Sequence, residues 1–183
     1  MKSMHGHLLV SSPQLLDPNF AKSVVLMVQH NDEGALGLIL NHPLDTTIAE
    51  AWEKVMSSPC PSNDPLHHGG PCESPLMVLH GHKEYSQVEV SSGVHFSTEE
   101  ETVRWLLDQE DIPFKFFVGC AGWAPGQLEE ELATGSWLTS EASAEDVFHG
   151  DDDQWFKVTK RIAADLGFPN LNPRLIPPDP SYN

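Results

Sequence analysis

The sequence has few cysteines, few cationic residues and no long apolar run. Its 3 cysteines, Cys60, Cys72 and Cys120, lie far apart and form no Cys-x-x-Cys pair. This spacing argues against a disulfide framework and against a cysteine-type zinc site. No stretch reaches the ~20 apolar residues of a membrane-spanning helix, and residues 1–7 lack the apolar segment of a secretory signal. We therefore expect a cytoplasmic protein without a membrane partner.

The shortage of positive charge is the sharpest compositional feature. The sequence holds 10 Lys and Arg residues against 27 Asp and Glu residues, which gives a formal net charge of -17. Proteins that bind DNA draw most of their non-specific affinity from Lys and Arg side chains that neutralise phosphates. A surface with the opposite charge repels a polyanion, so direct nucleic-acid binding is the least favoured function.

The length and composition fit a single domain. The chain has 183 residues, of which 39% are hydrophobic and 20% charged, so it can bury one substantial core. Residues 168–183 are rich in proline, which prevents regular structure. We expect one α+β domain over residues 1–167 and a proline-rich C-terminal tail over residues 168–183.

The N-terminal part of the chain predicts an antiparallel strand pair. Residues 6–11 and 23–30 are rich in apolar residues, and the second segment is apolar enough to be buried on both faces. Residues 31–34 end in glycine and predict a hairpin turn, so residues 35–40 should pair with residues 23–30. A tight hairpin favours a mixed sheet over a doubly wound parallel one.

Helices and further strands are predicted along the rest of the chain. A helix over residues 47–56 begins with a capping box of Thr47 and Glu50, and Ser97 with Glu100 predicts another, to about residue 110. Glycines and charged residues mark two more helices, expected from Pro125 to Gly135 and from Asp151 to Leu166. Strands are expected at residues 76–80, 85–90, 113–118 and 141–148.

Five short motifs follow one another along the chain. They are Leu15-Leu16-Asp17-Pro18-Asn19-Phe20 leading into Ser23-Val24-Val25; His30-Asn31 through Gly34-Ala35-Leu36-Gly37-Leu38-Ile39-Leu40-Asn41; Gly69-Gly70-Pro71; Gly119 through Gly122-Trp123-Ala124-Pro125-Gly126-Gln127-Leu128-Glu129; and Trp137-Leu138. In this order they resemble the YqgE/AlgH family of bacterial proteins, which has no assigned biochemical activity. The resemblance covers nearly the whole chain to Gly167. It implies a mixed, largely antiparallel bifurcated sheet folded into a pseudo-barrel with flanking helices, and it carries the family's label of transcriptional regulator.

Residues 119–126 allow several interpretations. A strand that turns into a helix at Cys120 is similar to a nucleophile elbow, but the full Gly-x-Ser-x-Gly pattern is missing. The helix N-terminus could hold an anion, although three glutamates follow at residues 129–131. The favoured interpretation is structural: the glycines permit close backbone approach, and Trp123 and Trp137 fill the interior of the pseudo-barrel.

A candidate ligand or partner patch lies in the same region. Gln127 and Glu131 lie one helical turn apart and could join Trp123 in binding a small ligand or a protein. Asp17, in a predicted turn, and Asn41, at the end of the predicted hairpin, complete the set of candidate residues. The alternative function, a small-molecule hydrolase or other enzyme, would use a cleft near Trp123 and Gln127.

The 10 histidines raise the question of a metal site. His5 and His7 form a His-Gly-His triplet, as do His80 and His82, and each triplet would place both rings on one face of a strand. Zinc or nickel could use such a pair with a third ligand. Surface histidines explain the surplus better, so the sequence assigns no metal, no cofactor and no catalytic residue.

These observations favour a non-enzymatic cytoplasmic domain that binds a protein or a small ligand, with any regulatory effect indirect. Direct DNA binding would require Lys157, Lys160, Arg161 and Arg174 to gather on one face. The oligomeric state stays open.

Overall fold

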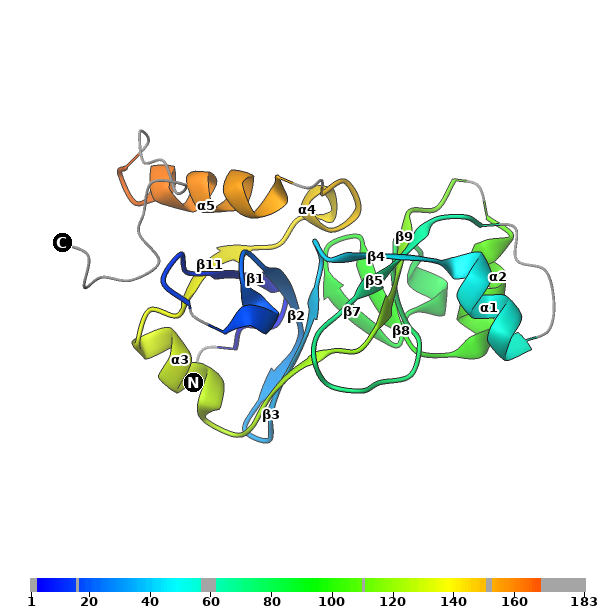
Figure 1. The fold of residues 1–183 in the computed structure, drawn as a ribbon, viewed down its shortest axis with the longest axis horizontal. Coiled ribbons are helices and arrows are strands. Elements are labelled where there is room, and N and C mark those ends of the chain that lie inside the picture. Colours follow the sequence, from blue (N-terminus) through cyan, green and yellow to red (C-terminus); the bar gives the residue numbers. More distant parts are fainter. Residues whose placement is uncertain (1–2, 16, 57–61, 110, 151–152, 169–183) are drawn as a thin grey trace.

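The computed structural model describes residues 3–15, 17–56, 62–109, 111–150 and 153–168 (Figure 1). The expected proline-rich tail lies outside the described residues, apart from Phe168. Over the described parts of the chain, no helix is long and apolar enough to cross a membrane.

The strands form two sheets. The five-stranded sheet is antiparallel throughout and has the order β10 (Ala121–Trp123), β3 (Gly34–Ile39), β2 (Val24–Asn31), β1 (His7–Ser11) and β11 (Trp137–Glu141). Its centre is the predicted hairpin, in which Asn31 pairs with Gly34 and Val25 with Ile39. The prediction of an antiparallel pair around residues 31–34 is therefore confirmed.

The six-stranded sheet is mixed. Its order is β4 (Pro43–Thr47), β5 (Pro65–His68), β9 (Phe114–Val118), β6 (Met77–His80), β8 (Val94–Ser97) and β7 (Val88–Ser91). The pair β5–β9 is parallel and its other pairings are antiparallel. The α+β class with a mixed, largely antiparallel arrangement is confirmed. The strands belong to two sheets, however, and do not close into a barrel.

Three apolar cores hold the two sheets and their helices together. A central core joins strands of both sheets to α4 (Ala144–Phe148) and α5 (Gln154–Asp165). A second core lies between the other face of the five-stranded sheet and α3 (Gln127–Ala133), and a third between the six-stranded sheet, α1 (Ile48–Met56) and α2 (Glu100–Leu107). Figure 1 shows α5 along one side of the five-stranded sheet and α1 and α2 beside the other sheet. Because β2 lies between two of these cores, most of its side chains are buried on both faces.

Local hydrogen bonds explain where the helices begin. The Thr47 and Glu50 capping box is confirmed, with the two reciprocal bonds at 3.1 and 3.3 Å. The second predicted capping box is wrong, because α2 begins at Glu100 and its N-cap residue is Glu99, not Ser97. The Ser97 hydroxyl instead donates to the Thr102 hydroxyl at 3.1 Å and accepts from the Glu99 N–H.

Three other local predictions are wrong. Residues 144–148 form helix α4 and not a strand, because Ser143 and Asp146 make a capping box. Pro125 does not open α3, because Gly126, with φ +79°, is the N-cap residue. The strand predicted to begin at residue 85 begins at Val88, since Lys83–Tyr85 form a 3-10 helix, and β8, which was not predicted, lies between β6 and β7.

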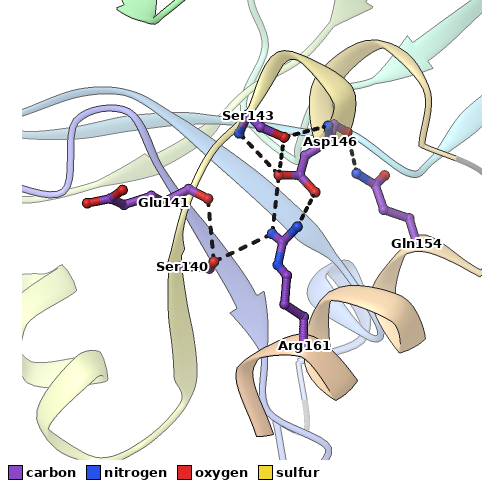
Figure 2. Close-up of polar contacts among 6 residues, drawn as sticks. All are labelled: Ser140, Glu141, Ser143, Asp146, Gln154 and Arg161. Atoms are coloured by element: carbon purple, nitrogen blue, oxygen red, sulfur yellow. Dashed lines mark hydrogen bonds and ion pairs between the residues drawn. The ribbon is translucent and has the colours of Figure 1, made fainter. Parts of the chain in front are cut away.

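The junction of α4 and α5 is held by an ion pair (Figure 2). Arg161 donates to both carboxylate oxygens of Asp146, at 2.9 and 3.2 Å, and the Gln154 amide donates to the Asp146 carbonyl at 2.6 Å. Burial alone would raise the pKa of Asp146, but hydrogen bonds from Arg161 and Ser143 outweigh burial and hold that pKa below its ordinary 3.8.

Candidate functional site

Trp123, Gln127 and Glu131 do come together, and they bond to one another. Trp123 ends β10, and the other two lie one turn apart on α3. The Trp123 indole donates to Glu131 Oε2 at 2.9 Å, and the Gln127 amide donates to Glu131 Oε1 at 2.9 Å. Gln127 Oε1 in turn accepts from the Ala124 N–H at 3.0 Å. Each polar group of the predicted patch therefore already has a partner within the chain.

A second indole completes this carboxylate clamp, defined here as Glu131 with Trp123 and Trp137. Trp137, at the start of β11, donates to Glu131 Oε2 at 2.7 Å. Trp123 and Trp137 are 6% and 4% exposed, and Phe20 packs against both rings at centroid distances of 6.2 and 5.4 Å. The carboxylate satisfies two buried indole N–H groups, which would otherwise be costly to bury. This arrangement ties β10, α3 and β11 together. The Glu131 carboxylate is occupied by the two indoles of the clamp.

Asp17 and Asn41 are also used locally. The Asp17 carboxylate accepts from the Asn19 N–H at 2.9 Å and caps the short 3-10 helix Pro18–Phe20. Asn41 accepts from the Val24 N–H at 2.8 Å and donates to the Lys22 carbonyl at 2.8 Å. Asp17 helps to position Phe20 beside the clamp, whereas Asn41 fixes the chain at the start of β2.

Cys120 does not have the environment of an activated hydrolase nucleophile. It is 8% exposed and forms an isolated antiparallel bridge with Cys72. Burial, and then the nearby Cys72, raise the pKa of the Cys120 thiol. A raised pKa disfavours the reactive thiolate, so the elbow interpretation finds no support at this residue.

The histidines of the second triplet lie in a partly buried cluster. His80 is fully buried, and its ring centroid is 5.9 Å from that of His95. Burial, and then repulsion from His95 and His82, lower the pKa of His80 to about 4. Over the described ranges, no group of three or more His, Cys, Asp or Glu side chains is arranged to hold a metal ion.

A pocket lies elsewhere, between the six-stranded sheet and its two helices. Its volume is about 370 Å³, within the range of small-molecule sites. It is lined by side chains from α1, α2, β5, the end of β9, the segment before β6 and the link between β8 and α2: Ile48, Ala51, Trp52, Leu66, Pro75, Leu76, Thr98, Glu100, Val103 and Val118. We call this the α1–α2 pocket. Of its ten lining residues, only Thr98 and Glu100 have polar side chains apart from the Trp52 indole N–H.

Charged groups stand at the edge of the α1–α2 pocket. The Arg104 guanidinium bonds to the Glu100 carboxylate at 2.7 Å and lies 5.4 Å from the centroid of the Trp52 ring. The ion pair and the cation–π contact hold one turn of α2 against α1. The pocket therefore has an apolar interior and a charged edge.

Sequence reasoning missed this pocket. The helix over residues 47–56 was predicted, and its Trp52 side chain is only 7% exposed. The pocket also needs Leu66, Pro75 and Val118, which come from distant segments. Helical periodicity gives the face of each helix, but not the space left between that face and the sheet.

Comparison with known proteins assigns the chain to a family. A family model described as AlgH-like matches residues 8–167. The chain belongs to the AlgH-like family. Its relatives include UPF0301 proteins of Chlorobaculum tepidum, 41% identical over 78% of each chain, and of Vibrio atlanticus, 36% identical over 84% of this chain and 88% of the relative.

Solved structures agree with this assignment. The solution structure of the AlgH protein from Pseudomonas aeruginosa matches with a TM-score of 0.75 and 29% identity, covering 91% of this chain and 90% of that one. A crystal structure from Corynebacterium diphtheriae, 24% identical, shares the fold with a TM-score of 0.68 over 88% and 87% of the two chains. The resemblance to the AlgH-like family drawn from the five motifs is confirmed.

Proposed function

We propose that this protein is a non-catalytic, cytoplasmic binding domain that takes a compact apolar molecule in the α1–α2 pocket, and that any regulatory effect follows from the occupancy of this pocket. The observation that carries the proposal is the pocket itself, an apolar space of about 370 Å³ between two helices and a sheet. Small-molecule sites combine an apolar interior with a few polar groups, as this one does.

The charge of the protein narrows the class of ligand. The net charge is -17. Glu100 at the pocket edge is paired with Arg104 at 2.7 Å, so the charge of the whole protein decides the sign of the field there. A negative surface lowers the local concentration of anions and raises that of cations. The ligand is therefore a neutral or cationic apolar molecule, and an anion of the same shape should bind less well.

The geometry of the carboxylate clamp argues against the enzyme alternative. A hydrolase near Trp123 and Gln127 would need polar groups that converge on an open space. Both polar ends of Gln127 and both oxygens of Glu131 are instead occupied by bonds within the chain. The pocket and the clamp lie on different sheets, so the proposed binding site does not include the clamp.

A pair of fluorescent probes tests the proposal. Phenylnaphthylamine is neutral and apolar, whereas anilinonaphthalene sulfonate has nearly the same aromatic skeleton with a negative charge. We expect saturable, one-to-one binding of the neutral probe with a Kd on the order of micromolar, and at least about tenfold weaker binding of the anion. Unsaturable fluorescence, or equal affinity for both probes, would contradict the proposal.

A further inference from the structure

Cys72 and Cys120 lie directly opposite each other. They form an antiparallel bridge outside the named strands, in which each N–H donates to the other residue's carbonyl at 2.9 Å. Cys72 follows the Gly69-Gly70-Pro71 bend, and Cys120 precedes β10. These two thiols are far apart in the sequence and adjacent in the fold.

The register places both side chains on the same face. Directly opposed residues of an antiparallel pair project to one side, with Cα atoms about 5.5 Å apart when they exchange both hydrogen bonds. A disulfide needs Cα atoms about 4.4–6.8 Å apart and Cβ atoms about 3.5–4.5 Å apart. The pair meets the first condition, and closing the bridge draws together Cβ atoms that such a pair holds about 5.5 Å apart. Gly122, two residues after Cys120, shares that face, and a Cβ built on it would lie 3.5 Å from the Cys72 Sγ. The Cys72 thiol therefore lies on the face to which the Cys120 side chain projects.

The two thiols differ in access to solvent. Cys72 is exposed and Cys120 is buried. Burial raises the pKa of the Cys120 thiol, which makes it slow to react with a dissolved oxidant. Cys72 is therefore the thiol that an oxidant meets first, and Cys120 is held beside it.

We propose that Cys72 and Cys120 form a reversible thiol–disulfide modification site, oxidised by a peroxide and restored by a thiol reductant. The Cys72 thiolate attacks a peroxide oxygen, the O–O bond breaks, and the released hydroxide takes a proton to become water. The resulting Cys72 sulfenic acid is then attacked by the adjacent Cys120 thiol, the S–O bond breaks, and the thiol proton leaves with the oxygen as a second water. Each sulfur is oxidised by one electron and the peroxide is reduced by two.

This pair is compatible with the absence of a disulfide framework in the sequence. A framework would be permanent, whereas both thiols are free in this structure. The inference is independent of the α1–α2 pocket. It rests on the register of one backbone bridge and on the exposure of one thiol.

The test uses the full chain with Cys60→Ser, so that the third thiol cannot compete. The native protein is treated with hydrogen peroxide and analysed by intact mass and by non-reducing peptide mapping. We expect the loss of two hydrogen masses, a peptide that links Cys72 to Cys120, and full reversal by dithiothreitol. The cross-link should form at least about tenfold faster in the native protein than in urea, because folding holds the two sulfurs together.

Two further variants serve as controls. Adding Cys120→Ser should abolish the cross-link and leave Cys72 with added oxygen, and adding Cys72→Ser should leave Cys120 largely unreacted. Stepwise addition of oxygen to Cys72 without any cross-link in the Cys60→Ser protein would overturn the proposal. So would equal rates of cross-linking in native and unfolded protein.

Discussion

At the scale of single residues, Glu131 is the best example of a side chain whose role depends on its neighbours. Its carboxylate accepts from two buried indoles and from Gln127. Sequence spacing correctly indicates that Gln127 and Glu131 are neighbours, but it cannot show that Trp137 approaches from β11. That third contact turns a possible ligand patch into an internal clamp.

Replacing Glu131 with Ala should therefore destabilise the fold. Two buried indole N–H groups would lose their acceptor, and each unsatisfied donor costs about 1–3 kcal/mol. We expect the free energy of unfolding to fall by about 2–4 kcal/mol, measured by urea denaturation. Glu130→Ala, on the exposed side of the same helix, is the matched control and should change stability by less than about 0.5 kcal/mol. Equal stability of the two variants would contradict the structural role.

His80 should make stability depend on pH. Its pKa is lowered from 6.5 to about 4, so the unfolded chain takes up a proton at a higher pH than the folded protein does. His80 therefore makes its full contribution to the free energy of unfolding above about pH 6.5. This contribution is lost as the pH falls towards about 4, and the loss reaches about 2 kcal/mol at about pH 5.

Urea denaturation at several pH values measures this effect. The variant His80→Gln should lose less stability between neutral pH and about pH 5 than the native protein does, because one titrating group is gone. His149→Gln, which changes an exposed histidine, is the matched control variant. The idea fails if His80→Gln retains the full dependence.

At the scale of elements, the sequence predicts most strands and helices but misplaces several ends. The hairpin, α1 and β9 follow from local pattern, turn chemistry and the Thr47 capping box. Helix α4 was missed because its five residues are too few for periodicity to show. Strand β10 was missed because its three residues are defined by pairing with β3, which is a non-local contact.

The α4–α5 junction gives a prediction at this scale. Asp146→Asn removes the charge that holds Arg161 (Figure 2), and the free energy of unfolding should fall by about 1–2 kcal/mol near neutral pH. Because the pKa of Asp146 is depressed, the stabilisation is present above about pH 3.8 and is lost as the pH falls below it.

Thermal unfolding of Asp146→Asn and Asp165→Asn compares the two sites. Asp165 lies at the exposed C-terminal end of α5, and its change should have the smaller effect. An unchanged Tm for Asp146→Asn, with Arg161 in place, would show that the ion pair does not stabilise the junction.

At the scale of the whole molecule, charge limits the partners. Lys157, Lys160 and Arg161 do share the exposed face of α5, while Arg174 lies outside the described residues. Arg161 is, however, held by Asp146, and the net charge is -17. We expect no measurable affinity for duplex DNA at physiological salt, assayed by fluorescence anisotropy. A salt-sensitive shift at nanomolar protein would contradict this expectation and restore direct DNA binding.

The α1–α2 pocket shows the limit of sequence reasoning at this scale. The apolar faces of its helices can be predicted, but the pocket exists because side chains from several separate segments leave a space unfilled. The clamp shows the opposite case. Its residues suggest an open binding site in the sequence, but Trp137 from another strand packs against them and bonds to Glu131. Family membership, by contrast, follows from motif order along the chain and is confirmed.

The most direct test fills the α1–α2 pocket from one of its walls. Ala51 lines the pocket and Ala49, on the same helix, does not. We predict that Ala51→Leu weakens phenylnaphthylamine binding and Ala51→Phe weakens it further, by at least about tenfold, while Ala49→Phe binds as the native protein does. Thermal unfolding checks that each variant is folded. Native-like binding by folded Ala51→Phe would contradict the proposal that this pocket is the binding site.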